Sequence, residues 1–175
     1  IYEPGLDELI KKNYIAKRLS FTTDIDKAIS LSDIIFICVG TPTKKGSIKV
    51  DLSFVYKCTK EILKYSKRKK IIVTKSTVPV GTGDEIEKIL KTKKKLFTVI
   101  SNPEFLREGE AIRDFRYPDR IVIGSNEKKT FNIMRKLYAP LTNKGSKFFT
   151  TSRRGAELIK YASKAFLATK ITFIN

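Results

Sequence analysis

The sequence predicts an α/β fold in which a doubly wound, mostly parallel sheet carries helices on both faces. Two observations lead to this prediction: strand-like runs alternate with helical patterns along the chain, and the runs are almost continuously apolar. Continuous apolar runs are typical of strands that are buried on both faces. With 175 residues, of which 41% are hydrophobic, the chain is long enough for one well-cored domain.

The predicted elements follow one another in a regular order. A short helix near residues 6–12 is expected first. Strands are predicted at IIFICV (34–39), KIIVT (70–74), LFTVIS (96–101), RIVIG (120–124) and KFFTT (147–151). Helices are predicted between them at 52–66, 83–92 and 130–141, the last ended by Pro140. The alternation of strand and helix implies right-handed crossovers and an open sheet.

The last predicted helix differs from the others. It begins near Gly155 and continues to the chain end through AELIKYASKAFLATKITFIN. This run is apolar on most faces, which suits a helix buried between two domains better than a helix on a surface.

The net charge is +18, from 36 basic and 18 acidic residues. The distribution of these charges nevertheless argues against a nucleic-acid partner. The lysines are scattered, the runs at 67–70 and 91–95 fall between a helix and a strand, and no exposed aromatics alternate with them. No apolar run is long enough for a membrane span, so we expect a cytoplasmic protein without a membrane partner. Cys38 and Cys58 lack metal-ligand spacing, so we expect two buried thiols and no metal site.

Polar segments follow three of the predicted strands. They are GTPT (40–43), KSTVPVGT (75–82) and NPEFLREGEAIRDF (102–115). One such turn needs no functional explanation, because Gly, Pro, Ser and Thr end many strands. Three of them at the carboxyl ends of parallel strands favour a ligand site, since ligands of open α/β sheets bind at that edge. Free backbone N–H groups and hydroxyls there suit the phosphates, ribose and carboxamide of a dinucleotide.

Two carboxylates in the third segment are candidates for acid/base chemistry. Glu104 and Glu108 are four residues apart, so they share one face if the segment after Pro103 is helical. Like charges at that distance would raise one pKa and produce a general base near neutral pH in a chain that contains no histidine. A solvated acidic start of a helix explains the same spacing equally well.

Lys160 and Lys164 have the same spacing on the apolar last helix. A partly desolvated lysine stabilises a developing oxyanion. The alternative to this catalytic role is that both lysines extend their ammonium groups into solvent. If both face inward, their repulsion requires an anion between them.

Taken together, these segments resemble the UDP-glucose/GDP-mannose dehydrogenase family over the whole chain. The matching segments, in order, are IYEPGLDEL, FTTD (21–24), FICVGTPT, VDLSFV (50–55), VTKSTVPVGT, SNPEFLREGEAIRDF, YPDRIVIG, LYAP and AELIKYASKAFLATKITFIN. The segments NPEFLREG and KSTVPVGT are the most specific of them.

The resemblance implies a Rossmann-like, incomplete NAD-binding domain over residues 1–152 and the start of a central interdomain helix over 153–175. It also implies an enzyme that oxidises C6 of UDP-glucose twice with two NAD, through an aldehyde and a cysteine thioester, to UDP-glucuronate. Full-length members of the family are expected to be homodimers or higher oligomers.

The same resemblance assigns roles to individual residues. Thr77 would position a water, Glu104 would activate it for thioester hydrolysis, and Lys160 would stabilise the C6 oxyanion. The expected NAD contacts are Val39, Gly40, Thr41, Pro42, Thr43, Ser76, Thr77, Val78 and Glu108. The expected substrate contacts are Glu104, Phe105, Leu106, Arg107, Glu108, Lys160 and Lys164.

The sequence departs from the family pattern in three ways. The family's G-x-G-x-x-G turn has no counterpart, and GTGDEI (81–86) lacks the third glycine and opens a helix within the sheet. Neither Cys38 nor Cys58 matches the catalytic cysteine, so we expect the chain alone to be an inactive fragment. Lys164 replaces an asparagine, so an amide that donates and accepts hydrogen bonds becomes a cation that only donates. A non-catalytic nucleotide-binding or partner-dependent fragment is the alternative.

Overall fold

A computed structural model describes residues 3–44 and 46–174. The first two residues of the IYEPGLDEL segment and the final Asn175 of the last predicted helix lie outside this description. The described strands form one five-stranded sheet in the order β1-β2-β3-β4-β5. They are β1 (Ile34–Ile37), β2 (Lys70–Thr74), β3 (Phe97–Ser101), β4 (Arg120–Ser125) and β5 (Lys147–Thr151). All five lie where the apolar runs predict them.

The sheet is mostly parallel, as predicted. β1 pairs with β2, β2 with β3, and β4 with β5 in parallel. β3 and β4 are antiparallel through the pairs Ile100↔Ser125 and Ser101↔Gly124. The carboxyl ends of β1, β2 and β3 therefore share one edge of the sheet. Because β4 runs the opposite way, its first residues lie alongside the segment that follows β3, and the Asn102 side-chain amide donates to the Val122 carbonyl oxygen at 3.0 Å.

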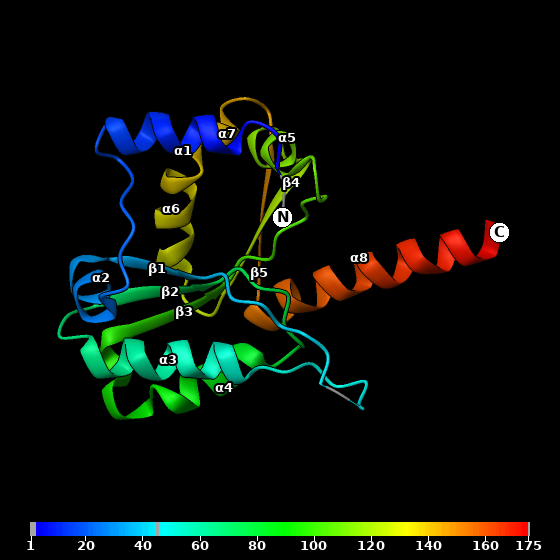
Figure 1. Cartoon of the computed structure of the whole chain (residues 1–175). Coiled ribbons are helices and arrows are strands. Elements are labelled where there is room, and N and C mark those ends of the chain that lie inside the picture. Colours follow the sequence, from blue (N-terminus) through cyan, green and yellow to red (C-terminus); the bar gives the residue numbers. More distant parts are fainter. Residues whose placement is uncertain (1–2, 45, 175) are drawn as a thin grey trace.

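Helices cover both faces of the sheet. They are α1 (Leu6–Ile15), α2 (Ile25–Leu31), α3 (Ser53–Tyr65), α4 (Thr82–Ile89), the 3-10 helix η1 (Lys91–Leu96), α5 (Ala111–Arg116), α6 (Lys128–Leu137), α7 (Ala139–Thr142) and α8 (Arg153–Ile174). Figure 1 shows α3 and α4 on one face and α6 on the other. Two hydrophobic cores result, one centred on Val55, Ile72 and Ile86, and the other on Ile100, Ile123 and Met134.

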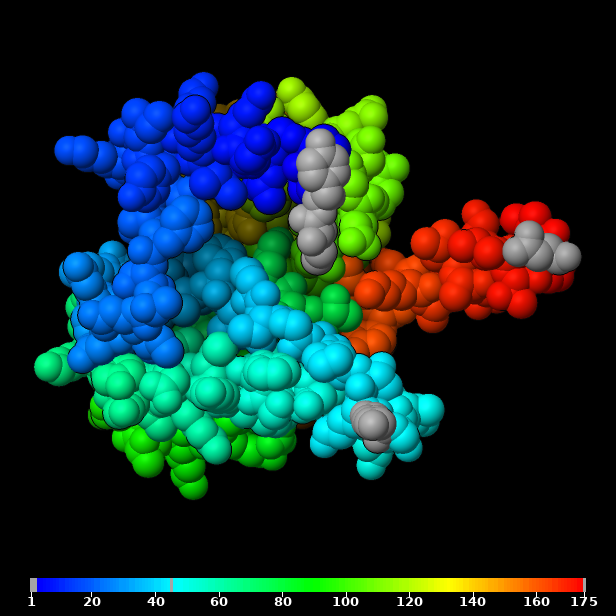
Figure 2. All heavy atoms as spheres, in the orientation of Figure 1, coloured from blue at the N-terminus to red at the C-terminus, as the bar shows by residue number. Residues whose placement is uncertain are grey.

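α8 begins two residues before its predicted start and leaves the body of the domain. Its first turns pack on β4 so closely that a Cβ added at Gly124 would lie 2.5 Å from the Ala156 Cβ. Its later turns project away from the sheet (Figures 1 and 2). Phe166, Leu167 and Phe173 are exposed there. The apolar composition of this half therefore has no covering partner among the described residues.

Three predictions about local structure need correction. Pro140 does not end a helix that continues to 141, because the first helix ends at Leu137 and Pro140 lies in the first turn of α7. A proline fits the first turn because its missing N–H has no partner there in any case. The prediction of two buried thiols is wrong for Cys38, which is exposed beyond the edge strand β1, while Cys58 is half-buried. The sequence patterns also missed α2 and α5, which are too short to show a period.

Two further findings concern the described residues as a whole. None of their helices is long and apolar enough to cross a membrane. They also contain no group of three or more His, Cys, Asp or Glu side chains placed to hold a metal ion.

Candidate active site

The loops after β1 and β2 are joined by side-chain hydroxyls. Thr41 Oγ1 donates to the Thr77 carbonyl oxygen at 2.8 Å, and Ser76 Oγ donates to the Val39 carbonyl oxygen at 2.6 Å. The structure therefore brings together the two loops in which the sequence places the NAD contacts. Thr41 and Ser76 use their hydroxyl hydrogens to connect these loops, so any contact they make with a ligand uses other atoms.

The loop after β1 is open to a ligand at Gly40. A Cβ added at this glycine would meet nothing within 4 Å. Among residues 3–44 and 46–174, the backbone N–H groups of Gly40 and Thr41 have no hydrogen-bond acceptor. Free N–H groups beside open space are what the polar groups of a dinucleotide need, so this loop fits the predicted cofactor contact.

An ion pair between a buried lysine and a half-buried carboxylate joins the loop after β3 to α8. Lys160 Nζ lies 2.8 Å from Glu104 Oε1 and also donates to the Glu104 carbonyl oxygen. Lys160 is only 5% exposed, and its Nζ lies 5.2 Å from the centre of the Phe105 ring. The Arg120 guanidinium lies 4.4 Å from the same ring, so Phe105 contacts two cations. The structure thus places Glu104, Phe105 and Lys160 in one cluster, as the resemblance implies.

The pairing of Glu104 and Glu108 on one helix face, one of the two interpretations of their spacing, is wrong. Residues 102–110 are not helical, and α5 begins only at Ala111, so the two carboxylates do not share a helix face. Instead, Glu104 Oε2 accepts a hydrogen bond from the Leu106 N–H at 2.6 Å. Gly109 has a φ of 82° and turns the chain before α5. Glu108 is exposed on this turn, as are Leu106 and Arg107.

The pKa of Glu104 also moves in the direction opposite to the prediction. Burial alone raises this pKa. The hydrogen bonds from Lys160 and the Leu106 N–H, together with the charges of Lys160 and Lys164, lower it by a larger amount. The net pKa lies below the ordinary value of 4.5, so the carboxylate is ionised at neutral pH. The reason is that its nearest charged neighbour is a cation from a distant helix, which sequence spacing does not reveal.

Lys160 and Lys164 do not both face inward. Lys164 is exposed and forms no ion pair with the residues that the structure describes. The condition under which an anion was expected between the two lysines is therefore not met, and the Glu104 carboxylate pairs with Lys160 alone. Lys164 acts on it from a greater distance, as the last of the causes that lower the Glu104 pKa.

Arg107 is bound within its own segment. Its guanidinium Nε and Nη2 donate to the two Asp114 carboxylate oxygens at 3.0 and 2.7 Å. The hydrogen bonds from Arg107 lower the pKa of Asp114 to about 2. Glu3 adds a second restraint, because its carboxylate accepts from the backbone N–H groups of Gly109 and Ile112. These contacts fix the turn that follows Glu104.

The sequence patterns missed a polar cluster at the same edge. Lys75 Nζ lies 3.3 Å from Asn102 Oδ1, which also accepts a hydrogen bond from the Tyr138 hydroxyl. Burial lowers the pKa of Lys75 to about 8, and burial raises the pKa of Tyr138 to about 12. Lys75 and Asn102 directly follow β2 and β3, so the strand-end rule could have found them. Tyr138 directly follows α6 and belongs to the matching segment LYAP, but nothing in that segment indicated a contact with Asn102.

Replacing Lys160 with methionine is expected to raise the pKa of Glu104, because the strongest favourable partner of the carboxylate is removed from a partly buried site. Carboxyl-carbon NMR titration of Glu104 measures this change. Lys164→Met is the matched control, and we expect it to raise the Glu104 pKa much less. Equal effects of both substitutions would show that the 2.8 Å pair is not the dominant contact.

This geometry defines the class of protein. A sheet whose three parallel strands end in ligand-accessible loops at one edge is typical of a Rossmann-like domain, and the carboxylate and lysine pair beside these loops could serve proton transfer and oxyanion stabilisation. Residues 1–142 match the model of the UDP-glucose/GDP-mannose dehydrogenase family, NAD binding domain. The chain belongs to this family, which confirms the resemblance seen in its motifs.

Curated relatives agree with this assignment. The chain is 51% identical over 179 residues to the UDP-glucose 6-dehydrogenase of Rhizobium meliloti (strain 1021), with 100% of the chain and 41% of the relative covered. It is 48% identical over 178 residues to the UDP-glucose 6-dehydrogenase TuaD of Bacillus subtilis (strain 168), with 100% of the chain and 38% of the relative covered. The chain therefore spans about two fifths of the length of these relatives.

Solved structures confirm the α/β fold. A ternary complex of GDP-mannose dehydrogenase from Pseudomonas aeruginosa matches with a TM-score of 0.91 and 35% identity, covering 99% of this chain and 41% of that one. A UDP-glucose dehydrogenase from the archaeon Pyrobaculum islandicum matches with a TM-score of 0.90 and 38% identity, covering 100% of this chain and 41% of that one.

Proposed function

We propose that this chain supplies the NAD-binding part of an enzyme that oxidises UDP-glucose to UDP-glucuronate. The observation that carries the proposal is the pair of half-buried Glu104 and buried Lys160, which lies at the sheet edge where the loops after β1, β2 and β3 begin. NAD, when bound, would accept hydride from C6 of the sugar in each of two steps. The names of the curated relatives support this reaction for the whole protein.

The proposed roles follow from the charges of the pair. Lys160 would stabilise an oxyanion at C6, and Glu104 would accept a proton from a water held by Thr77. In the structure the two charges satisfy each other at 2.8 Å. The Lys160 ammonium group has three N–H donors and directs two of them to Glu104, so the third is available for a substrate oxygen while the pair stays formed. The lowered pKa keeps Glu104 ionised and ready to accept the proton.

The remaining assignments are part of the same proposal. The cofactor contacts are residues 39–43, residues 76–78 and Glu108. The sugar nucleotide lies along residues 104–108 and also contacts Lys160 and Lys164. Residues 1–152 form the cofactor domain and α8 from residue 153 leads into a central domain. We propose a cytoplasmic enzyme in which the whole protein forms homodimers or higher oligomers.

A direct test is to mix the purified chain with NAD and UDP-glucose and to follow NADH by its absorbance. We expect no turnover, because the first hydride transfer needs NAD held by a glycine-rich phosphate turn that has no counterpart in the sequence, and the thioester step needs a cysteine that neither Cys38 nor Cys58 matches. Robust NADH formation would show that this cysteine and the glycine-rich phosphate turn are dispensable. Calorimetry with each ligand gives the second readout, and we expect weak NAD binding that Gly40→Ala reduces further.

A second candidate is a domain that binds nucleotides only with a partner chain. The exposed apolar side chains of α8, including Phe166, Leu167 and Phe173, favour it, since an apolar surface of this kind is costly in water. Sedimentation would separate the two candidates. A monomer that binds NAD by itself would exclude the partner-dependent function.

A further inference from the structure

Three charged side chains lie buried on one face of α8. Arg153, Glu157 and Lys160 follow one another at intervals of four and three residues, which places them on the same side of a helix. All three are at most 5% exposed. Each binds a different part of the domain, so this face of α8 is joined to the sheet edge by charges as well as by apolar contacts.

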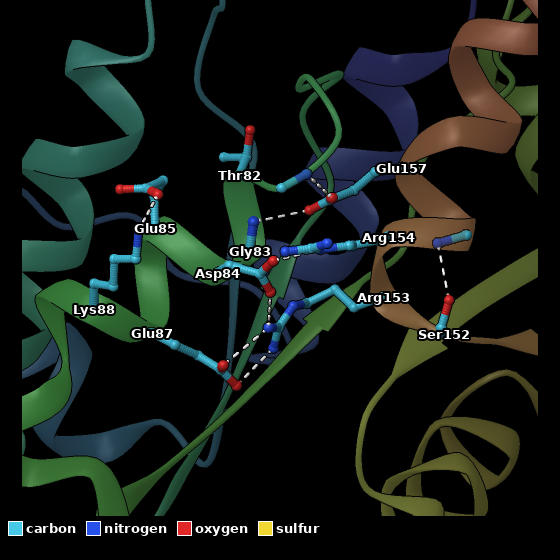
Figure 3. A network of polar contacts seen from close by, with 12 residues as sticks. Thr82, Gly83, Asp84, Glu85, Glu87, Lys88, Ser152, Arg153, Arg154 and Glu157 are labelled. Carbon is cyan, nitrogen blue, oxygen red and sulfur yellow. Dashed lines mark hydrogen bonds and ion pairs between the residues drawn. The ribbon is translucent and has the colours of Figure 1, made fainter.

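Arg153 binds the side chains of α4. Its guanidinium donates to both Glu87 carboxylate oxygens at 2.6 and 2.9 Å and to Asp84 Oδ1 at 2.5 Å. Figure 3 shows this group from close by, with the Glu157 carboxylate beside it. Arg154 reaches Asp84 Oδ2 from the exposed side at 2.6 Å. The first turn of α8 is thus held on α4.

Glu157 binds the backbone where α4 begins. Its two carboxylate oxygens accept from the N–H groups of Gly81 and Gly83 at 2.7 and 2.8 Å. These N–H groups have no partner within their own helix, so the carboxylate satisfies two donors and complements the positive end of the helix dipole. Burial raises the pKa of Glu157 although both N–H groups lower it. The first turn of α4 is therefore occupied by a side chain of this protein.

Gly81 and Gly83 connect this contact to the loop after β2. Gly81 has a φ of 94°, a conformation that favours glycine, and it closes the segment that contains Ser76 and Thr77. A Cβ at Gly83 would lie 2.4 Å from the Arg153 side chain. Both glycines thus allow α8 to approach the backbone of this loop closely.

Lys160 lies one turn further along α8 and binds Glu104 in the loop after β3. The rise from residue 157 to residue 160 of a helix is about 4.5 Å. A helix is stiff over that distance, so a shift at Glu157 is transmitted to Lys160. The same helix therefore binds the loop after β2 through one carboxylate and the loop after β3 through one ammonium group.

We propose that Glu157 is a positioning residue, which fixes α8 against the Gly81 and Gly83 backbone and thereby holds Lys160 at Glu104. This inference rests on the proposed roles of Lys160 and Glu104 in the reaction. A purely structural cap of α4 would stabilise the fold without any specific effect on the pair of Lys160 and Glu104. The two possibilities differ in what happens to Glu104 when Glu157 is changed.

The test is a carboxyl-carbon NMR titration of Glu104 in the 175-residue chain, with Lys160→Met as the reference for complete loss of the pair. Glu157→Gln keeps the side-chain size but leaves one oxygen to serve two N–H groups. We expect it to raise the Glu104 pKa at least half as far as Lys160→Met does. Glu87→Gln is the control, because it weakens the Arg153 contact on α4 without touching the Gly81 and Gly83 N–H groups. We expect it to leave the Glu104 pKa unchanged.

An unchanged Glu104 pKa in Glu157→Gln would overturn the proposal, and so would equal rises in Glu157→Gln and Glu87→Gln. If Glu157→Gln does not fold, Glu157→Asp decides, since it keeps the charge and is too short to reach both N–H groups. We expect an intermediate rise from it, and no rise would also overturn the proposal. The titration uses neither NAD nor a sugar nucleotide, so its outcome is independent of whether the proposed reaction is correct.

Discussion

Arg153→Ala is expected to lower the free energy of unfolding by about 3 kcal/mol, the lower end of what breaking a buried ion pair costs. The Arg153 side chain is 2% exposed, and its loss leaves Asp84 and Glu87 without their common cation. The lower end applies because these two carboxylates, at 27% and 38% exposure, keep part of their hydration. Urea unfolding followed by far-ultraviolet circular dichroism measures the change.

Arg154→Ala is the matched control for this prediction. Arg154 is the next residue of α8 and also binds Asp84, but its side chain is 71% exposed. Exposed pairs contribute about 0–1 kcal/mol, so we expect a loss within that range. Equal losses from Arg153→Ala and Arg154→Ala would show that burial of the guanidinium is not what makes the contact strong.

The contribution of Arg153 is also expected to depend on pH. The hydrogen bond from Arg153 is the largest cause that lowers the pKa of Asp84 below its ordinary value of 3.8, ahead of the opposing effect of burial. A carboxylate with a lowered pKa in the folded state contributes stability above its unfolded pKa and loses it as the pH falls through the folded pKa. The difference between the native chain and Arg153→Ala should therefore be constant near neutral pH and shrink below about pH 4.

Gly124→Val is expected to destabilise the fold by about 3 kcal/mol, near the top of the range for overpacked sites. A Cβ at this position would lie 2.5 Å from the Ala156 Cβ, 2.7 Å from the Ser152 carbonyl oxygen and 2.9 Å from the Arg153 Cα. Two of these atoms belong to the backbone and cannot rotate away. Valine therefore forces the first turn of α8 off β4, and thermal unfolding should show the loss.

Gly40→Ala is the control glycine, since nothing lies within 4 Å of its added Cβ. We expect a change within about 0.5 kcal/mol, as for surface substitutions that meet no neighbour. Its effect should appear in NAD binding, because the added methyl group occupies the space that a cofactor would approach. A large loss of stability from Gly40→Ala, or none from Gly124→Val, would contradict the packing described for the loop after β1 and for β4.

Local patterns in the sequence predicted the strands well. KIIVT and KFFTT coincide with β2 and β5, because an uninterrupted apolar or β-branched run bounded by polar turns is typical of a strand. The run at 52–66 likewise became α3, which buries Val55 and Ile62. The antiparallel pairing of β3 with β4 was not predictable, since the apolar pattern of a strand does not depend on whether its neighbour runs parallel or antiparallel to it.

The sequence predicted which residues belong to the candidate site, but it did not predict which of them contact one another. Glu104 and Lys160 were named from the sequence, but spacing offered Glu104 only an interaction with Glu108 four residues away or a place in a solvated acidic helix start. The structure pairs it with a lysine 56 residues away, which reverses the direction of its pKa shift. The sequence did not indicate Lys75 and Tyr138, because the burial that shifts their pKa values becomes visible only once their neighbours are known.

The sequence by itself determined the α/β class, the positions of the strands and the family, because hydrophobic periodicity and short motifs are local properties of the chain. Only the tertiary structure decided which charges meet. Arg153, Glu157 and Lys160 look like ordinary charged residues of a helix, yet each is buried against an element far away in the chain. Burial in a medium of low dielectric makes such contacts strong, and no pattern within one helix reports it.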